Sequence, residues 1–296
     1  MQPAHHALVL DIGGSHVSAA VVNLESRLTL QDSESRAAVN PDLSAASLLE
    51  VWTTNALKAH DVAGRPSIAH VGIAMPGPFE YATGISKLEH KFAALYGSDV
   101  GAALKSNFAQ QLGDVPVLFG NDATLFALGE WWAGAARCYG RVLGVTLGTG
   151  LGSGFVVDGL PCYGGEGLPS NGAIWNLPYL NGIAEDAVSG RALELAYYKR
   201  TGQARSSVQI ALAANHGDEA AQTAFLELGM HLGRILKPWV TRFQPSCLVV
   251  GGNLARAWHL FRQPLEAALL DQKLEVRAST LYDSANLFGA AALGVR

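Results

Sequence analysis

Short apolar runs separated by glycine turns open the chain. Residues 7–12 are largely apolar, Gly13-Gly14-Ser15 follows, and residues 17–24 are apolar again. This order predicts two antiparallel strands joined by the turn. The same order recurs at 142–157, around the glycine run 148–152. The repetition predicts two related lobes, each of which offers one glycine turn to a shared cleft.

Other stretches carry apolar residues at helical spacing, and short buried-type runs lie between them. The predicted helices cover 43–60, 100–112, 123–136, 185–200, 219–242 and 286–293, and the further strands cover 71–75, 115–119, 247–250 and 274–278. Ser44, near the start of the first predicted helical stretch, and Asp99, just before the second, are the expected N-caps. Strands interspersed with helices predict an α/β fold.

The stretch Gly120-Asn121-Asp122 carries the first candidate chemistry. It joins the end of the predicted strand 115–119 to the start of the helix at 123. Capping of that helix is the plain explanation, but a helix needs one cap, so the second polar side chain remains to be explained. A carboxylate that can take a proton, near a glycine turn that can cradle phosphate, indicates phosphoryl transfer to a hydroxyl.

Three further turns suit a ligand, and each also has a purely structural explanation. The turn after Asp11 supplies N–H groups and a hydroxyl for a phosphate and its metal, although it also suits an ordinary hairpin. Gly251-Gly252 permits close packing of a flat group such as adenine, or merely tight helix–strand packing. Pro76-Gly77-Pro78 either delivers backbone to a ligand or is a plain loop.

Composition narrows the class of protein. At 296 residues the chain exceeds what one hydrophobic core usually supports, which favours two lobes. Its formal net charge of −4 and pI of about 6.1 give no electrostatic footprint for nucleic acid or an anionic membrane. Its three cysteines lack paired spacing, which disfavours a zinc knuckle or disulfide framework and suits a reducing compartment.

Neither a membrane span nor a leader sequence is predicted. No apolar run approaches the roughly 20 residues that a span needs, and residues 1–7 lack the pattern of a signal peptide. We therefore expect a soluble, cytoplasmic protein. His5 and His6 are interpreted as solvated side chains rather than as a metal pair.

Taken in order, these segments resemble the ROK family of bacterial sugar kinases, within the actin-like ATPase superfamily. The matching pieces are Asp11-Ile-Gly-Gly-Ser15, Met75-Pro-Gly-Pro78, Gly120-Asn-Asp-Ala-Thr-Leu-Phe-Ala-Leu-Gly-Glu130, Leu147-Gly-Thr-Gly-Leu-Gly152, Val250-Gly-Gly252 and Leu287-Phe-Gly-Ala-Ala-Ala-Leu293. The resemblance implies a two-lobed actin-like ATPase (ribonuclease H-like) α/β fold with a central cleft, and a homodimer. Residues 1–118 with 285–296 would form the N-terminal lobe and residues 119–284 the C-terminal lobe.

The resemblance also implies an activity and its residues. The protein would use ATP and Mg²⁺ to phosphorylate a hexose, most readily glucose, at the 6-hydroxyl, with Asp122 as the catalytic base. The sugar would be bound by Asn121, Asp122, Glu185, Asn171 and Gly77. The nucleotide would be bound by Asp11, Gly13, Gly14, Ser15, Gly148, Thr149, Gly150, Gly251 and Gly252. Of these, Asp11 would orient Mg²⁺, directly or through a water.

The segment 164–185 departs from the family pattern. The family has Gly-Glu-x-Gly-His and then a cysteine-rich zinc loop, but this segment contains no histidine or cysteine, so no zinc site is expected. Counting from Gly164, the family's first glutamate falls near Asn171, whereas Glu185 matches its last. Either the sugar site has decayed, or an apolar core replaces the metal in an active kinase. The second interpretation is favoured, with a core formed by Trp175, Pro178 and Tyr179.

The sequence does not decide the sugar, the phosphoryl donor or the class of protein. The family often has Asn-Leu where Lys91-Phe92 stands, so one sugar-binding amide is missing or is supplied by His90, Lys91 or Asn171. N-acetylmannosamine, N-acetylglucosamine and fructose also fit as sugars, and polyphosphate also fits as donor. A sugar-sensing ROK regulator is the rival class, but its winged helix would precede the first phosphate strand, where only Met1–His6 lies. A nucleotide-binding scaffold without turnover is the third possibility.

Overall fold

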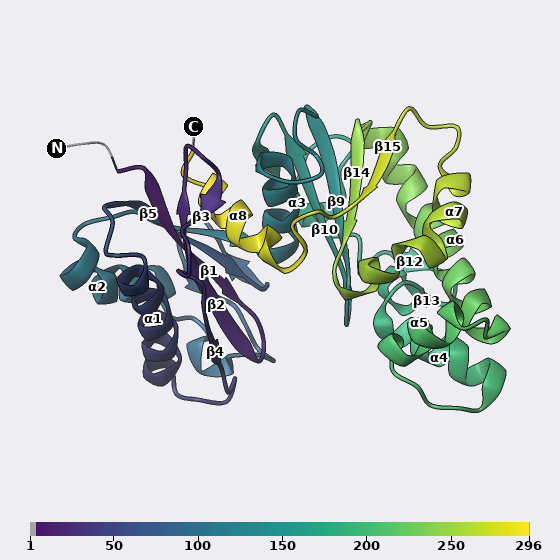
Figure 1. Ribbon diagram of the computed structural model, residues 1–296, viewed down its shortest axis with the longest axis horizontal. Coiled ribbons are helices and arrows are strands. Elements are labelled where there is room, and N and C mark those ends of the chain that lie inside the picture. Colours follow the sequence, from purple (N-terminus) through teal and green to yellow (C-terminus); the bar gives the residue numbers. More distant parts are fainter. Residues whose placement is uncertain (1–3, 296) are drawn as a thin grey trace. The chain divides into compact units, whose positions relative to one another are not determined.

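The computed structural model describes residues 4–295 and contains two compact units. The first comprises Met1–Ala133 with Ser284–Arg296, and the second is Gly134–Asp283. Each unit consists of a mixed β-sheet with helices packed against it, which confirms the expected α/β class (Figure 1).

The first unit is built on a six-stranded sheet with the order β3-β2-β1-β5-β8, and β4 also pairs with β2. Strands β1 and β2 are antiparallel, as predicted, whereas β1, β5 and β8 run parallel to one another. The strands are β1 (His6–Ile12), β2 (His16–Asn23), β3 (Leu28–Thr29), β4 (Ser35–Ala38), β5 (Ile68–Met75) and β8 (Val117–Asn121). The carboxyl ends of three parallel strands therefore meet along one edge.

Helices pack on the sheet of the first unit. They are α1 (Ala45–Val62), α2 (Val100–Leu112), α3 (Asp122–Trp132) and α8 (Ala285–Ala292). A small hairpin, β6 (Phe79–Glu80) with β7 (Ile85–Ser86), and the 3₁₀ turn η1 (Ala93–Leu95) lie between β5 and α2. Ser44 and Asp99 cap α1 and α2 as predicted, each accepting a backbone N–H from within the first turn.

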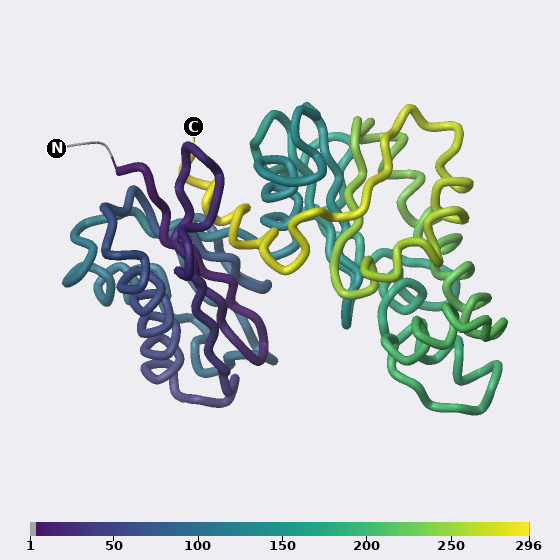
Figure 2. The backbone as a smooth tube through the Cα atoms, in the orientation of Figure 1, coloured from purple at the N-terminus to yellow at the C-terminus, as the bar shows by residue number. Residues whose placement is uncertain are grey.

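Helix α8 closes the first unit, although it follows the whole of the second unit in sequence. It packs on β1, β5 and α3, and the tube in Figure 2 shows its yellow segment beside the purple strands. Leu8, Leu10 and Ile12 belong to the apolar cluster that also contains Trp52 of α1. Because Ala7 and Val9 alternate with them and are also buried, both faces of β1 are covered, as its nearly continuous apolar sequence requires.

The second unit repeats this plan. Its sheet has the order β11-β10-β9-β14-β15, in which β9 and β10 are antiparallel and β9, β14 and β15 are parallel. The strands are β9 (Arg141–Leu147), β10 (Leu151–Val157), β11 (Leu160–Cys162), β14 (Cys247–Gly251) and β15 (Glu275–Ala278). The predicted repetition of strand, glycine turn and strand is confirmed, and it extends to the strand order of the whole sheet.

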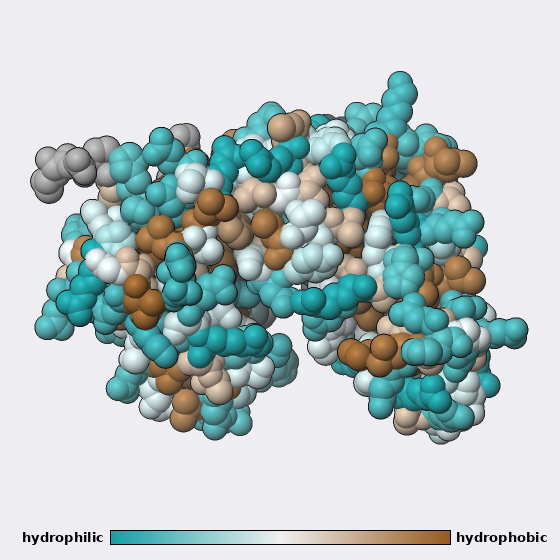
Figure 3. Space-filling model, in the orientation of Figure 1, coloured by the Kyte–Doolittle hydropathy of each residue, from teal (hydrophilic) through white to brown (hydrophobic). Residues whose placement is uncertain are grey.

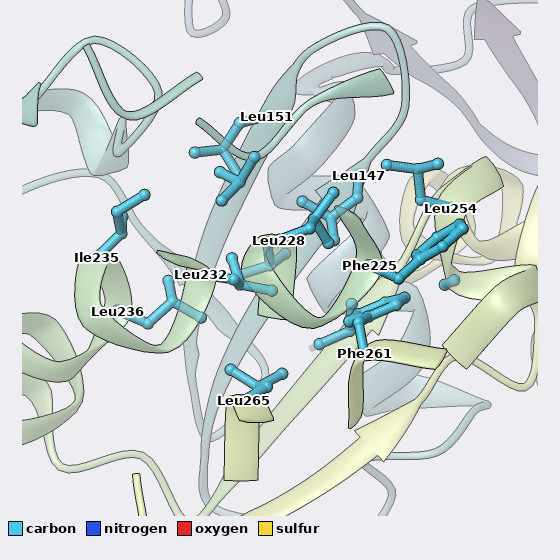
Figure 4. Packing of buried hydrophobic residues seen from close by; sticks show 14 of the residues in the cluster. Leu147, Leu151, Phe225, Leu228, Leu232, Ile235, Leu236, Leu254, Phe261 and Leu265 are labelled. Atoms are coloured by element: carbon cyan, nitrogen blue, oxygen red, sulfur yellow. The ribbon is translucent and has the colours of Figure 1, made fainter. Parts of the chain in front are cut away.

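Helices and short turns complete the second unit. The helices are α4 (Gly190–Thr201), α5 (Ser207–Asn215), α6 (Glu219–Phe243) and α7 (Trp258–Ala268), and the small hairpin is β12 (Pro178–Tyr179) with β13 (Gly182–Ile183). The 3₁₀ turns are η2 (Ser170–Gly172), η3 (Ala184–Asp186), η4 (Asn253–Ala257) and η5 (Tyr282–Ser284). Figure 4 shows the apolar face of α6, with Phe225, Leu228 and Leu232 directed at Leu147 and other side chains of the core.

The division between the units differs from the expected one at 118/119. Strand β8 pairs with β5 along its full length, and α3 continues directly from it and packs on α8. Both elements therefore belong to the first unit, which continues to Ala133. Consequently Asp122 lies in the first unit rather than in the second.

Hydrophilic residues cover most of the face seen in Figure 3, and hydrophobic residues form small separate groups. Among the described residues, none of the helices is both long and apolar enough to cross a membrane. The expectation about a leader sequence at residues 1–7 falls partly on residues 1–3, which lie outside the described part.

Candidate active site

The polar residues predicted in the first unit gather at the carboxyl edge of its parallel strands. Asp11 of β1 lies opposite Ala74 of β5, and the next residue, Met75, lies opposite Asn121 of β8. Parallel strands in register deliver their last residues to the same edge, which is where α/β sheets usually bind ligands. The structure thus brings together Asp11, the turn that follows it, and the Asn121-Asp122 pair.

Asn121 and Asp122 play different structural parts at the start of α3. Asn121 is the N-cap, because its Oδ1 accepts the N–H groups of Ala123 at 3.1 Å and Thr124 at 3.2 Å. Asp122 Oδ1 accepts the Ala123 N–H as well, at 2.8 Å. Since Asn121 alone satisfies the capping requirement, the carboxylate of Asp122 is not needed for it.

The surroundings of Asp122 favour its protonated form. Desolvation by burial raises the pKa of this carboxyl above its ordinary value, against the opposing effects of the Ala123 N–H, the positive charge of Lys91 and the Asn121 side chain. A carboxylate with a raised pKa is a stronger base towards a hydroxyl than an ordinary exposed aspartate.

The first glycine turn is closed by its own backbone. Gly13 N–H donates to His16 O at 2.9 Å, and Ser15, at the tip of the turn, is exposed. Beside the turn, Asp11 Oδ1 accepts Nδ2 of Asn286 at 3.1 Å, so α8 orients this carboxylate. The Asn286 contact could not be predicted from the sequence, because 275 residues separate the two partners.

Gly77 lies next to the capping amide. A methyl group placed on Gly77 would lie 3.2 Å from the hydroxyl of Tyr81 and 3.9 Å from Nδ2 of Asn121. That hydroxyl accepts Asn121 Nδ2 at 3.2 Å and donates to Met75 O at 3.3 Å. Tyr81 therefore fixes the free end of the Asn121 amide, a role for which the sequence carries no signal.

The nucleotide residues predicted in the second unit also lie together. Gly148 N–H donates to Gly150 O at 3.0 Å and closes the second turn, leaving Thr149 exposed. Gly251 lies opposite Thr146 in the parallel ladder. Gly252 has a φ of 79° and packs so closely on Leu147 O that a side chain would collide with it. Tight strand packing therefore accounts for Gly252, and it also places the glycine pair beside the second turn.

Glu185 fastens this second turn. Its Oε2 accepts the N–H of Leu151 at 3.0 Å and lies where a side chain on Gly150 would be. Its Oε1 pairs with Nη2 of Arg191 at 2.8 Å. The carboxylate expected to bind sugar hydroxyls is thus engaged with the second glycine turn and with an arginine.

The segment that departs from the family pattern is held by apolar packing, but not by all the predicted side chains. Ile174 is buried, and Leu177 and Tyr179 pack on the core of the second unit. The Tyr179 hydroxyl is also hydrogen-bonded to His231 Nδ1 at 2.8 Å. Trp175 is 44% exposed, and Pro178 is exposed too, so their assignment to that core is wrong. In an irregular loop, no periodicity indicates which side chains face inward.

Asn171 lies in the turn η2 with a φ of 54° and is exposed. Its neighbours tie the turn to β10, because Ser153 Oγ donates to Gly172 O at 2.6 Å and accepts Ile174 N–H at 3.1 Å. The backbone continues to Glu185, whose N–H donates to Trp175 O at 3.0 Å. The segment that follows the turn is thus joined to Glu185 by a backbone hydrogen bond, and the Asn171 side chain takes no part in that hydrogen bond.

No group of three or more His, Cys, Asp or Glu side chains suited to a metal occurs within the described residues. Mg²⁺ in phosphoryl-transfer sites commonly has one or two protein carboxylates and takes its remaining ligands from phosphates and water. A single oriented carboxylate at Asp11, beside a turn with backbone N–H groups, fits that mode of binding.

Comparisons with known proteins give matches over most of the chain. The model of the ROK family matches residues 7–296. The chain is 28% identical to glucokinase of Thermotoga maritima over 253 residues, covering 76% of this chain and 78% of that protein. It is 30% identical to N-acetylgalactosamine kinase AgaK of a Shewanella species, covering 96% and 95% respectively. Among solved structures, a ROK family glucokinase from Streptomyces griseus, in complex with glucose and AMPPNP, superposes with a TM-score of 0.75 at 24% identity, covering 97% of this chain and 98% of that one. This likeness confirms the fold expected from the resemblance.

Proposed function

The chain belongs to the ROK family, and from this premise we propose that it transfers a phosphoryl group from Mg²⁺-bound ATP to the 6-hydroxyl of a hexose. Asp122 is the general base, and Asn121 holds the sugar beside it. The observation that carries the proposal is the position of the Asp122 carboxylate, which starts a helix that another side chain caps and shares a sheet edge with the first glycine turn.

In this reaction the protein itself needs to do little covalent chemistry. Phosphoryl transfer depends on aligning the acceptor hydroxyl with the phosphorus and on neutralising charge. A base within about 2.6–3.2 Å of the hydroxyl accepts its proton as the new bond forms, which typically contributes a factor of about 10²–10⁴ in rate. The raised pKa of Asp122 and its fixed place on α3 suit this task.

The nucleotide contacts follow from the two glycine turns. We assign the phosphates to Gly13, Gly14 and Ser15 and to Gly148, Thr149 and Gly150, and the adenosine to Gly251 and Gly252. Bound Mg²⁺, oriented by Asp11, would neutralise phosphate charge. A backbone turn that exposes N–H groups binds an anion without requiring a side chain.

Glucose is the first sugar to test, and an N-acetylhexosamine is the second. A glucokinase and an N-acetylgalactosamine kinase are similar to this chain to nearly the same degree, which supports both classes. Fructose and N-acetylmannosamine complete the panel. Glu185 and Asn171 are proposed sugar contacts in the second unit, and Gly77 in the first.

A coupled assay of ADP release over these sugars tests the proposal. We expect one sugar to give saturable turnover that requires both ATP and Mg²⁺, and polyphosphate is tested as the second donor. The Asp122→Asn variant is expected to keep sugar binding, measured calorimetrically, and to lose about 10²–10⁴ in kcat. Turnover of no sugar despite intact ATP binding would instead indicate a scaffold. The homodimer implied by the resemblance stays a prediction, and light scattering after size exclusion measures it.

A further inference from the structure

One cation lies at the sheet edge of the first unit without a role in the proposed chemistry. Lys91 belongs to the segment between β7 and α2, and its side chain extends along the first glycine turn. A methyl group built on Gly14 would lie 3.3 Å from both Cε and Nζ of Lys91. The glycine therefore leaves the room in which this side chain lies.

The charge of the same ammonium also acts on the proposed base. Its positive charge acts on Asp122, where it favours the ionised carboxylate. Lys91 thus lies next to the turn assigned to phosphates while its charge reaches the carboxylate assigned to the acceptor hydroxyl. Between those two groups, the proposed reaction must place the phosphorus.

The segment that carries Lys91 is fixed in place, although the lysine itself is exposed. Leu88, Phe92 and Leu95 around it are buried, and the ring of Phe92 packs edge-on against Trp52 with centroids 5.3 Å apart. Within residues 4–295, no carboxylate pairs with the Lys91 ammonium. By contrast, Lys87 on the same segment pairs with Glu80 at 3.1 Å. The charge of Lys91 is therefore available to an anionic ligand.

We propose that Lys91 is a catalytic residue whose ammonium contacts the phosphoryl group during its transfer to the sugar. The inference rests on the proposed kinase function and adds a residue to it. In the step, the sugar oxygen forms a bond to the γ-phosphorus, and the bond from that phosphorus to the bridging oxygen breaks, leaving its electron pair on ADP. The hydroxyl proton passes to Asp122. Lys91 stabilises the negative charge on the transferred oxygens, where a fixed cation is most effective.

Steady-state kinetics of Lys91→Met, Lys91→Arg and the matched control Lys87→Met test the proposal. Lys87→Met removes the same charge from the same segment. We expect Lys91→Met to lower kcat by about 10²-fold or more while the calorimetric Kd values for sugar and for Mg-ADP stay within about twofold. Lys91→Arg should recover part of kcat, and Lys87→Met should behave as wild type.

A second readout isolates the transition state. Aluminium fluoride, bound together with Mg-ADP and sugar, mimics the transferring phosphoryl group in the transition state. Lys91→Met should bind this transition-state mimic at least about tenfold more weakly. Thermal melting verifies that the variant folds. Unchanged kcat would overturn the inference, as would a loss of sugar affinity with kcat retained, which would make Lys91 a sugar-binding residue. Failure of the proposed function is seen separately, as a wild-type enzyme that phosphorylates no sugar.

Discussion

Because the pKa of Asp122 is raised, lowering the pH should weaken catalysis and stabilise the folded state. Because the base must be ionised, kcat/KM should fall as the pH decreases through this pKa, at a higher pH than an ordinary aspartate would give. For stability, a folded-state pKa above the unfolded value means that the folded form binds the proton more tightly. This contribution is present below the unfolded pKa and is lost as the pH rises through the folded one.

Asp122→Asn should therefore raise Tm at neutral pH, because it removes a charge that burial disfavours. Asparagine keeps an oxygen that can accept the Ala123 N–H. The gain should shrink as the pH is lowered towards the unfolded value of about 4. Calorimetric melting of both proteins across pH measures it, with Asp114→Asn, at an exposed carboxylate paired with Lys105, as the control. A Tm difference that does not vary with pH would contradict the prediction.

Glu185 offers a residue-level test of a different kind. Glu185→Ala removes the acceptor for Leu151 N–H and should cost about 1–3 kcal/mol in the free energy of unfolding, since a partly buried donor is left unpaired. Nucleotide affinity should fall with it as the second turn loosens. Glu185→Gln retains an acceptor and should preserve both quantities. Chemical denaturation and Mg-ADP titration make the comparison, and a glutamine variant that loses only sugar affinity would instead assign this carboxylate to the sugar.

Among the helices and strands, a close contact between α3 and α8 in the first unit depends on two glycines. A side chain on Gly289 of α8 would overlap Leu125 O of α3, and one on Gly129 of α3 would overlap Ala285 O of α8. Each helix presents backbone to the other at these points. The contact also supports the start of α3, where Asp122 lies.

Gly289→Ala should accordingly destabilise the protein by about 1–3 kcal/mol or more. In a solvent-exposed helix the same change stabilises the protein by up to about 1 kcal/mol. The sign of the change in the free energy of unfolding therefore shows whether the close helix contact is present. Gly164→Ala, at a position with no atom within 4 Å, is the control. The midpoints of urea unfolding of the two variants are compared with that of the wild type. An unchanged midpoint for Gly289→Ala would show that the helices can separate at no cost in stability.

Elements and caps were predictable because local sequence determines them, whereas contacts between distant segments were not. Ser44, Asp99 and the Asn121-Asp122 pair were located from neighbouring residues alone. The hydrogen bond from Asn286 to Asp11 and the position of Lys91 beside Gly14 depend on how the sheet and loops are arranged. The helix α5 was not predicted, although Ser206 and Gln209 form a capping box that the sequence does display.

At the scale of the whole chain, the boundary between the two units after Ala133 also depends on contacts between distant segments. The resemblance places the lobe boundary at 118/119, yet parallel pairing of β8 with β5 keeps β8 and the helix that follows it in the first unit. Parallel pairing joins segments that are remote in sequence, so periodicity alone gives no sign of it.

The two units should differ in their dependence on α8. The second unit, Gly134–Asp283, is continuous and has its own core. A chain that ends at Asp283 should keep slow amide hydrogen exchange in β9 and β14 and lose it in β1 and β5, which α8 covers in the intact protein. Exchange followed by mass spectrometry, with the intact chain as reference, measures both. Rapid exchange in β9 or protection in β1 would contradict the expectation.

The return of α8 to the first unit sets an order of events during protein synthesis. The ribosome releases β1, β5 and α3 early, but the helix that covers them emerges only after Asp283. While the second unit is being synthesised, the first unit therefore still exposes an apolar sheet face. Domains usually complete folding from the N-terminus, but the first unit of this chain must wait until α8 has been made. The nascent first unit is therefore the part that chaperones would need to protect.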